Sequence, residues 1–326
     1  MTTPLEQLAD ASGVDFPNLR KARELTRDGL ASRRETLGNL ESDDDVAIVL
    51  MGSWGRAEVT SGSDDDFMLL IRGDERTEVR PARSDVEAIL DRPPGSQGIF
   101  GEPVSSTTII ERIGLEADSN TNLSRRMLLL LESVHATRQD IYDDVHAQLL
   151  DRYLDQSVKP QHPPRFLLND VIRYWRTMCV DFAGKEREGP EKWGLRNAKL
   201  RTARKILFAG GLLPVLECES RTKDEMAEFL ATQFRMPPVD RIAMSFIKHG
   251  AIDQGARALT AYDEFLAILD DEDKRDHLNK LTRETAKQSD VFGEAARLGK
   301  ELEIGLLALL FETDDLPKLV REYGVF

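Results

Sequence analysis

The chain has 326 residues, of which 40% are hydrophobic and 31% are charged. This balance excludes a disordered chain, which would be poorer in apolar residues, and a protein built from membrane spans, which would be richer. The formal net charge of −14 argues against strong non-specific binding to nucleic acids, because Lys and Arg supply most of the affinity for phosphate backbones. One domain has roughly 100–200 residues, so the length predicts two domains.

The chain carries no signal for export or for a membrane. No basic start is followed by an apolar block, and apolar runs such as 306–311 fall well short of the ~18 residues that a membrane span needs. We therefore expect a cytoplasmic protein with no membrane partner. Cys179 and Cys218 lack C-x-x-C spacing and the five histidines lack paired metal spacing, so we expect neither a zinc site nor a disulfide framework.

The first predicted elements are a helix and a buried strand. Apolar residues at helical spacing predict a helix over 16–40, with Asp15 as its N-cap. The run V-A-I-V-L-M over 46–51 is typical of a strand that is buried on both faces, and Gly52 ends it. We expect a short helix over 53–59, whose N-terminal amides would attract phosphate.

Three successive aspartates precede a second apolar strand, which we predict over 67–71. Side chains alternate along a strand, so Asp64 and Asp66 share one face and Asp65 takes the other. Two carboxylates on one face can hold a divalent metal ion. We expect Asp65 to be solvated or to play a supporting part, and not to be a ligand.

The remaining elements are mostly helices. Before residue 158 we predict helices over 80–90, 107–113, 122–133 and 141–154, and a third strand over 99–104. The Pro-containing stretch 158–164 disfavours a continuing helix, so we divide the chain into domains of 1–160 and 161–326. The helices predicted beyond it cover 165–183, 195–208, 223–234, 240–248, 256–269, 273–287 and 292–311. The second domain is therefore predicted to be an all-α helical bundle.

The order of strand, G-S-x-G-R, spacer, G-S-D-x-D and strand resembles the signature of the DNA polymerase β-like nucleotidyltransferase superfamily. The matching residues are Gly52, Ser53, Gly55, Arg56, Gly62, Ser63, Asp64 and Asp66. The motif covers about twenty residues, and its several fixed parts make it more specific than a lone glycine pattern. The resemblance implies an α/β (α+β) fold with a small mixed β-sheet flanked by helices, here followed by the helical bundle.

The resemblance also implies an activity. It is the Mg²⁺-dependent transfer of a nucleoside monophosphate from a nucleoside triphosphate to an acceptor hydroxyl, with release of pyrophosphate. Two Mg²⁺, or Mn²⁺ in their place, would be held by Asp64 and Asp66, which would be catalytic. The nucleotide-binding residues of the motif would be Gly52, Ser53, Arg56 and Ser63. The residue types agree with this, because glycine lets the backbone approach a phosphate and Mg²⁺ favours carboxylates with phosphate oxygens.

A third carboxylate is implied by the same resemblance, from a later strand, as a general base or a further metal ligand. Glu102, in G-I-F-G-E-P-V, is the first candidate, and we include it among the catalytic residues. Asp118 is the second, although D-S-N-T-N before an apolar helix is also a good N-cap region. Without either, the site would lack a base, or the protein would be a catalytically reduced, nucleotide-binding regulatory module.

A basic segment follows the predicted domain boundary. Residues 165–205 hold eleven Lys and Arg against five Asp and Glu, opposite to the chain average. We interpret its helices as closing over the nucleotide, the alternative being solvated charged faces. The predicted nucleotide-binding residues are Arg173, Asn197, Lys199 and Arg201. Lys199 falls near the apolar side of its helix, where a charge needs a partner or a ligand.

The sequence leaves the acceptor open among a protein side chain, a small molecule and a tRNA 3′ end. The segment after the second strand is loosely similar to the uridylyltransferases and adenylyltransferases that modify nitrogen-regulation proteins. A tRNA acceptor would fit a toxin of a toxin–antitoxin pair, since toxins with this catalytic core are known. The acidic charge disfavours a general polynucleotide polymerase, and we expect no DNA partner.

Overall fold

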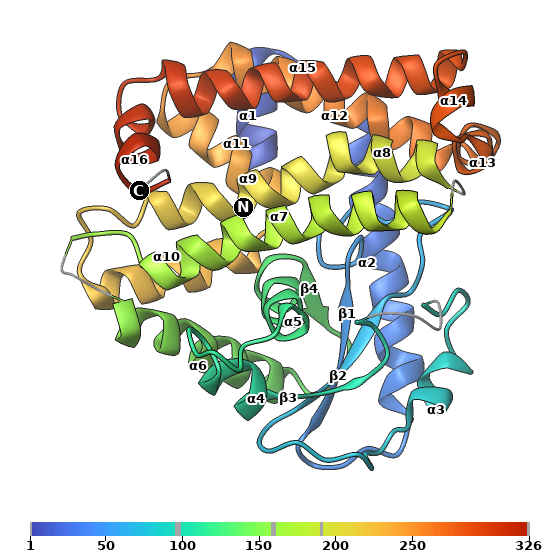
Figure 1. Cartoon of the computed structure of the whole chain (residues 1–326), viewed down its shortest axis with the longest axis vertical. Coiled ribbons are helices and arrows are strands. Elements are labelled where there is room, and N and C mark those ends of the chain that lie inside the picture. The colour runs from blue at the N-terminus through green and yellow to red at the C-terminus, as the bar shows by residue number, and fades with distance from the viewer. Residues whose placement is uncertain (1, 95–98, 158–160, 190–191, 325–326) are drawn as a thin grey trace.

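A small mixed sheet lies at one end of a largely helical molecule (Figure 1). The computed structural model describes residues 2–94, 99–157, 161–189 and 192–324. Within them, β1 (Val46–Met51) pairs antiparallel with β2 (Phe67–Ile71) and with β4 (Ser133–His135). β3 (Pro103–Ser105) pairs parallel with β2, which gives the order β3-β2-β1-β4. The predicted mixed sheet flanked by helices is therefore present.

The two faces of the sheet belong to different hydrophobic clusters, as strand alternation requires. On one face Phe67, Leu69 and Ile71 pack in a cluster with Leu37 of α2 (Pro17–Gly38). On the other, Met68 and Leu70 join the main core of the protein. The second apolar strand predicted over 67–71 is therefore present and buried on both faces.

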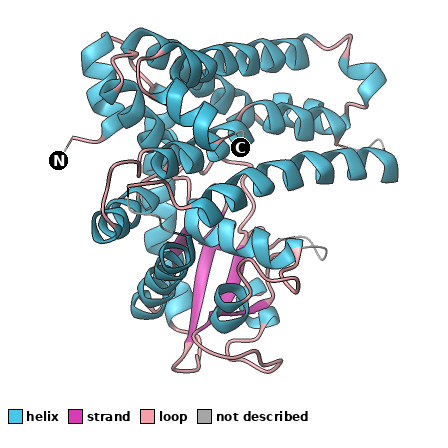
Figure 2. Cartoon of the chain, turned by 60° about the vertical axis from the view of Figure 1, so that its left-hand side comes forward, coloured by secondary structure: helices cyan, strands magenta, loops and turns pink. Residues whose placement is uncertain are grey.

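Helices cover the sheet and build the rest of the molecule (Figure 2). Those up to residue 157 are α1 (Pro4–Ser12), α2 (Pro17–Gly38), α3 (Arg83–Glu87), α4 (Ser106–Glu111), α5 (Asn120–Leu131) and α6 (Gln139–Ser157). Those after it are α7 (Arg165–Glu188), α8 (Trp193–Arg201), α9 (Ala203–Leu216), α10 (Lys223–Arg235), α11 (Pro238–Lys248), α12 (Ile252–Asp270), α13 (Glu272–Lys280), α14 (Arg283–Ala286), α15 (Asp290–Glu312) and α16 (Leu316–Tyr323). None of the helices in the described ranges is long and apolar enough to cross a membrane.

The N-terminal helices are capped by acids from the far end of the chain. Asp240 of α11 accepts a hydrogen bond from the Leu5 amide at 3.0 Å, and Asp263 of α12 accepts one from the Leu19 amide at 2.7 Å. These remote carboxylates satisfy free amides in the first turns of α1 and α2. The prediction of Asp15 as the N-cap is wrong, because Phe16 holds that position. The N-terminal segment thus packs on the C-terminal helices.

The buried core shows no break at the predicted domain boundary. One cluster runs from Leu8 of α1 through Met68 of β2 to Leu309 of α15. The division into 1–160 and 161–326 stays a prediction, and residues 158–160 of the predicted linker lie outside the described part.

Several predicted elements differ in the structure. The helix predicted over 53–59 is absent. Residues 52–57 form successive turns and 58–60 have no regular structure, and Ala57 adopts a left-handed conformation with φ of 55° that a helix does not allow. The helix predicted over 195–208 breaks at Thr202, which separates α8 from α9. The end of the helix predicted over 122–133 is instead the short strand β4. Helices α1 and α16 were not predicted.

Two fully buried arginines connect elements that are distant in the chain. Arg126 of α5 pairs at 2.7 Å with Asp118 and with Asp170 of α7, and donates to the Tyr153 hydroxyl at 2.9 Å. Arg241 of α11 donates to carbonyl oxygens of three other segments, those of Leu131, Gly210, Gln233, Phe234 and Met236. Such bonds satisfy buried carbonyls that helix ends leave free.

Candidate active site

The Gly-Ser turn lies directly against the aspartates that precede β2. The Met51 amide donates to the Asp66 carbonyl oxygen at 2.8 Å, which joins the end of β1 to the start of β2. Gly52 has φ of 66°, and a Cβ atom built on it would lie 3.4 Å from an Asp66 carboxylate oxygen. The two halves of the motif therefore meet, and glycine allows that approach.

The turn also packs closely on the end of α5. The Gly52 amide donates to the Glu132 carbonyl oxygen at 3.0 Å. A Cβ atom on Gly55 would lie only 2.0 Å from the Glu132 carbonyl carbon, so any larger residue at position 55 would displace the turn. The expected phosphate site at a helix N-terminus is not formed, because these residues are turns. The turn itself lines the cavity.

A polar cavity of about 90 Å³, which we call the aspartate cavity, opens beside this turn. Its walls come from the turn, from the segment before β2 and from the helices above. The lining residues are Gly52, Ser53, Arg56, Glu58, Thr60, Gly62, Ser63, Asp64, Asp66, Lys199, Ala203, Arg204, Tyr262, Leu266, Leu269 and Arg275. Seven of the predicted site residues, Gly52, Ser53, Arg56, Ser63, Asp64, Asp66 and Lys199, are thus brought together.

The two aspartates of the cavity repel each other. Asp64 is exposed to the cavity, whereas Asp66 is half-buried. Burial, followed by the negative charge of Asp64, raises the pKa of Asp66 to about 6. Within the described residues neither aspartate forms an ion pair, and a bound divalent ion would remove the repulsion between them.

Asp65 has a structural role on the side of the chain opposite to Asp64 and Asp66. Its carboxylate accepts hydrogen bonds from Trp54 Nε1 and Arg33 Nη2, each at 3.1 Å, and from the Arg92 amide at 3.2 Å. The side chain is buried, so the expectation that it is solvated is wrong, whereas its placement on the other face is confirmed. Asp65 holds the segment that presents its two neighbours.

Lys199 and Arg204 bring positive charge to the aspartates from the helices above. Arg204 Nη1 lies 3.4 Å from Glu132 Oε1. For Lys199 the structure shows no ion pair or hydrogen bond within the described residues. Desolvation, followed by the positive charges of Arg204 and Arg56, lowers its pKa to about 8. By its accessible surface Lys199 is nevertheless exposed to the open cavity, so water can still reach its ammonium group.

Arg56 lines the cavity, but its charge is already paired. Its guanidinium contacts Glu58 at 2.8 Å and forms a short ion pair with Glu132. Although burial opposes the charged form, Glu132 and Glu58 raise the pKa of Arg56. Glu58 also accepts a hydrogen bond from the Tyr262 hydroxyl at 2.7 Å. This network supports the floor of the cavity and leaves Arg56 less available to a phosphate.

Glu102 does not lie in the aspartate cavity. It follows Gly101, whose φ is 79°, and its carboxylate forms an ion pair with Arg83 of α3 at 2.8 Å. The left-handed turn directs the chain toward α3 at the edge of the sheet. Asp118 is equally committed, because both of its oxygens accept hydrogen bonds from Arg126 at 2.7 Å. The structure therefore supplies neither candidate third carboxylate to the site.

Three predicted nucleotide-binding residues also lie away from the cavity. Arg173 pairs with Asp170 at 3.1 Å, next to the Arg126 network. Arg201 donates to Asn197 at 2.7 Å, and its Cβ lies beside Gly299 of α15. Asn197 and Arg201 point away because they share one side of α8, whereas Lys199, two residues from each, projects from the other side toward the cavity.

The sequence reasoning missed three residues of the site. Arg204 belongs to the basic segment but was not singled out, since its direction depends on the break after α8. Arg275 of α13 lies over Gly62, where a Cβ atom would come within 2.1 Å of its guanidinium carbon. Tyr262 of α12 is more than 190 residues from the motif, and nothing local in the sequence marks it.

The donor set fits Mg²⁺ that is completed by a substrate. In the described part of the chain no three His, Cys, Asp or Glu side chains are grouped so that they could hold a metal ion. Mg²⁺ commonly uses one or two carboxylates, with water and substrate phosphates filling its other positions. Asp64 and Asp66 meet this requirement. Comparison with models of known protein families found no match, and comparison with curated proteins found none.

Proposed function

We propose that the chain is a Mg²⁺-dependent nucleotidyltransferase that moves a nucleoside monophosphate from a nucleoside triphosphate to an acceptor hydroxyl. One observation carries the proposal. Asp64 and Asp66 share a cavity with the Gly52–Ser53 turn, and the cations Lys199 and Arg204 face them. Carboxylates for a metal, a turn for phosphates and cations for the leaving group are the parts that phosphoryl-type transfer requires.

In this proposal the acidic and the basic residues of the cavity have different roles. Asp64 and Asp66 would hold Mg²⁺, or Mn²⁺ in its place, and the bound ions would stabilise the attacking and leaving oxygens of an in-line displacement. The acceptor oxygen forms a bond to the α-phosphorus, and the bond from that phosphorus to the bridging β-oxygen breaks. Pyrophosphate leaves with the electron pair. Lys199 and Arg204 offset the negative charge that develops on it.

A second function is favoured by a specific observation. Neither Glu102 nor Asp118 reaches the aspartate cavity, because each is paired with an arginine elsewhere. A nucleotide-binding regulatory module of the same fold, without transfer activity, would need no general base. Such a protein would bind a triphosphate with Mg²⁺ and release no pyrophosphate.

The deciding experiment supplies each of the four α-labelled triphosphates with Mg²⁺ and fractionated cell extract. We expect label to move from one of them onto an acceptor, with pyrophosphate released, and an Asp66→Ala chain to transfer none. Tight Mg²⁺-dependent binding of a triphosphate with no transfer to any fraction would support the regulatory module. Absence of both binding and transfer would remove both functions.

A further inference from the structure

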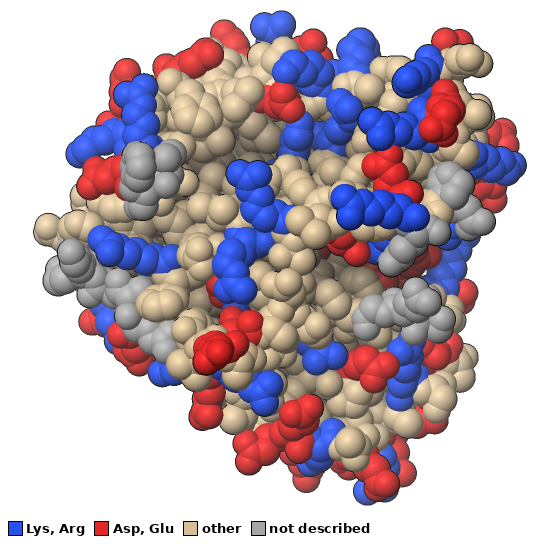
Figure 3. Space-filling model, in the orientation of Figure 1, with Lys and Arg blue, Asp and Glu red and all other residues tan. Residues whose placement is uncertain are grey.

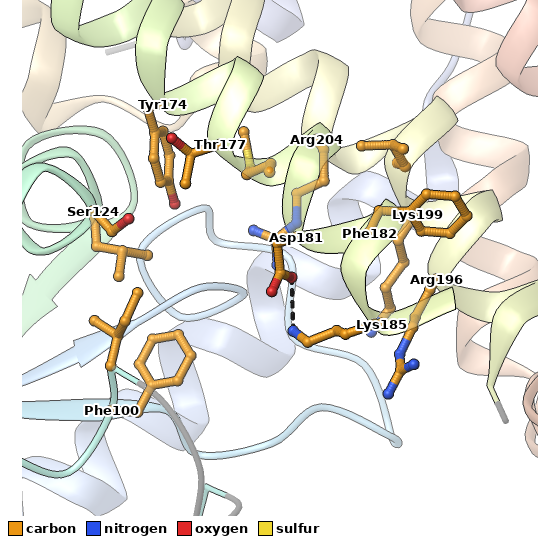
Figure 4. A pocket seen from close by; sticks show the side chains of 14 residues that line it. Phe100, Ser124, Tyr174, Thr177, Asp181, Phe182, Lys185, Arg196, Lys199 and Arg204 are labelled. Carbon is orange, nitrogen blue, oxygen red and sulfur yellow. Dashed lines mark hydrogen bonds and ion pairs between the residues drawn. The ribbon is translucent and has the colours of Figure 1, made fainter. Parts of the chain in front are cut away.

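A second cavity, which we call the chamber, adjoins the aspartate cavity. It encloses about 400 Å³, and the two cavities share Lys199 and Arg204 as lining residues. The walls come from the segment before β3 and from α5, α7, α8 and α9 (Figure 4). Figure 3 shows this face of the molecule, with Lys and Arg side chains gathered over α7 and α8. The aspartate cavity is too small for more than phosphate groups, so the larger chamber must be considered as a substrate site.

The lining of the chamber is apolar with a positive bias. Its apolar part includes Phe100, Met178 and Phe182. Its charged residues are Asp181, Lys185, Arg196, Lys199 and Arg204. Asp181 is the one carboxylate of the described lining, and it neutralises Lys185 through an ion pair of 2.7 Å. The chamber is therefore suited to an apolar body that carries a negative group.

The sheet order indicates which substrate lies on the chamber side. The Gly52–Ser53 turn follows β1, the aspartates precede β2, and the chamber segment with Ile99 and Phe100 leads into β3. Because the sheet runs β3-β2-β1, the aspartates lie between the turn and the chamber. An in-line displacement places the attacking and leaving oxygens on opposite sides of the phosphorus. With pyrophosphate at the turn, the attacking hydroxyl comes from the chamber.

We propose that the chamber binds the acceptor, and that the acceptor is a small molecule with an apolar ring body, an anionic group and a hydroxyl. This inference rests on the proposed function. A volume of about 400 Å³ falls within the ~300–1,000 Å³ of small-molecule pockets.

The proton of the acceptor hydroxyl leaves through the open side of the chamber. The acceptor oxygen bonds to the α-phosphorus, the bond to the bridging oxygen of pyrophosphate breaks, and the hydroxyl proton passes to water. Water reaches this wall of the chamber, because the Asp181 side chain is 57% exposed, and its charge is paired with Lys185 at 2.7 Å.

Ligand binding can be tested without any transfer activity. The probe is 8-anilinonaphthalene-1-sulfonate, an apolar anion whose fluorescence rises in apolar sites, with uncharged N-phenyl-1-naphthylamine for comparison. Met178→Trp fills the chamber, and Val180→Trp is the matched control, because Val180 lies on the same helix with 70% of its surface exposed. We expect the anion to bind the wild type and Val180→Trp equally and Met178→Trp at least about tenfold more weakly.

The outcomes separate the two proposals. Equal binding of the anion to Met178→Trp, or stronger binding of the uncharged probe, would overturn the chamber assignment whatever the enzyme does. If Met178→Trp does not fold, as judged by circular dichroism, Leu200→Trp on α8 fills the chamber from the other side. Anion binding that behaves as expected, with no transfer to any acceptor, would leave the chamber standing and would count against the proposed function alone.

The acceptor class is tested with labelled triphosphate and size-fractionated extract. We expect label in the low-molecular-weight fraction with the wild type and Val180→Trp, and little with Met178→Trp, while all three bind triphosphate equally. Label on protein or on RNA, undiminished by Met178→Trp, would overturn the inference.

Discussion

Two acidic pairs in this protein have opposite surroundings. Asp118 and Asp170 enclose Arg126, whose guanidinium bonds to both at 2.7 Å, and their side chains are only 3% and 4% exposed. Asp64 and Asp66 face an open cavity, and burial together with Asp64 raises the pKa of Asp66 to about 6. The first pair has its cation built into the fold. The second pair faces Lys199 and Arg204 across the cavity but forms no ion pair within the described residues, so its charge remains available to a bound cation.

The largest expected effect concerns Asp64 and Asp66, the pair in the aspartate cavity. Asp64→Ala or Asp66→Ala should lower transfer by at least about 1,000-fold, because each removes a ligand for the ion that stabilises the transition state. Steady-state release of pyrophosphate measures this. Glu102→Gln is the control and should stay within about twofold, since Glu102 pairs with Arg83 outside the cavity. Turnover retained by either alanine variant would end the metal assignment.

The pair Asp118 and Asp170, which encloses Arg126, should matter for the stability of the fold. Arg126→Met leaves two buried carboxylates without their cation and should lower the free energy of unfolding by about 3–5 kcal/mol. Urea denaturation followed by circular dichroism measures it. Arg125→Met, at the next position of α5, should cost less than about 1 kcal/mol, because the structure shows Arg125 with no ion pair within the described residues. Equal losses in the two variants would mean that the Arg126 network contributes no special stability.

A third prediction concerns Lys199, a cation that lines the aspartate cavity. Lys199→Met should weaken binding of the Mg²⁺–triphosphate complex roughly 10- to 100-fold, because an unpaired cation in the cavity is lost. Calorimetric titration with a non-hydrolysable triphosphate reports this directly. The same substitution at Arg201 should change the affinity less than about twofold, since Arg201 is bonded to Asn197 away from the cavity. A larger effect at Arg201 would restore the original prediction for that helix.

The smallest expected effect is a gain of stability. The pKa of Asp66 is higher in the folded chain than its usual value of 3.8, so the fold favours the protonated side chain. This stabilisation is complete below about pH 4 and is lost as the pH rises through about 6. Without Mg²⁺ near neutral pH, Asp66→Asn should therefore raise the free energy of unfolding by about 1 kcal/mol. The gain should vanish at about pH 4 in parallel urea titrations. A gain of the same size at both pH values would show that ionisation of Asp66 is not its cause.

The elements that carry the motif could be predicted from the sequence because their signals are local. The runs of apolar residues at β1 and β2 gave both strands, and period-two alternation placed Asp64 and Asp66 together, away from Asp65. Helical periodicity likewise predicted the largely helical second half. Short elements failed where tertiary contacts outweigh local preference. The helix predicted over 53–59 is replaced by turns up to residue 57, where Gly55 packs on the Glu132 backbone, a contact that no local pattern reveals.

The rest of the site depends on distances that a sequence does not contain. Whether a carboxylate is available to a ligand depends on whether another side chain already pairs with it. The side chains that pair with Asp118 and Glu102 lie on other turns or elements. Arg173 and Arg204 are both basic residues of the same segment, yet one pairs with Asp170 and the other lines both cavities. The break at Thr202 separates the cavity residue Lys199 from Arg204 along the chain.

Arg241 sets an order of events during synthesis of the chain. Its guanidinium holds the Leu131 carbonyl oxygen at 2.9 Å, directly before Glu132. Asp240 and Asp263 similarly provide the caps of the first two helices. The ribosome delivers these partners late, so the N-terminal half waits for more than a hundred residues before its ends are secured. The aspartate cavity is likewise complete only after Arg275, the last of its lining residues along the chain, has been synthesised.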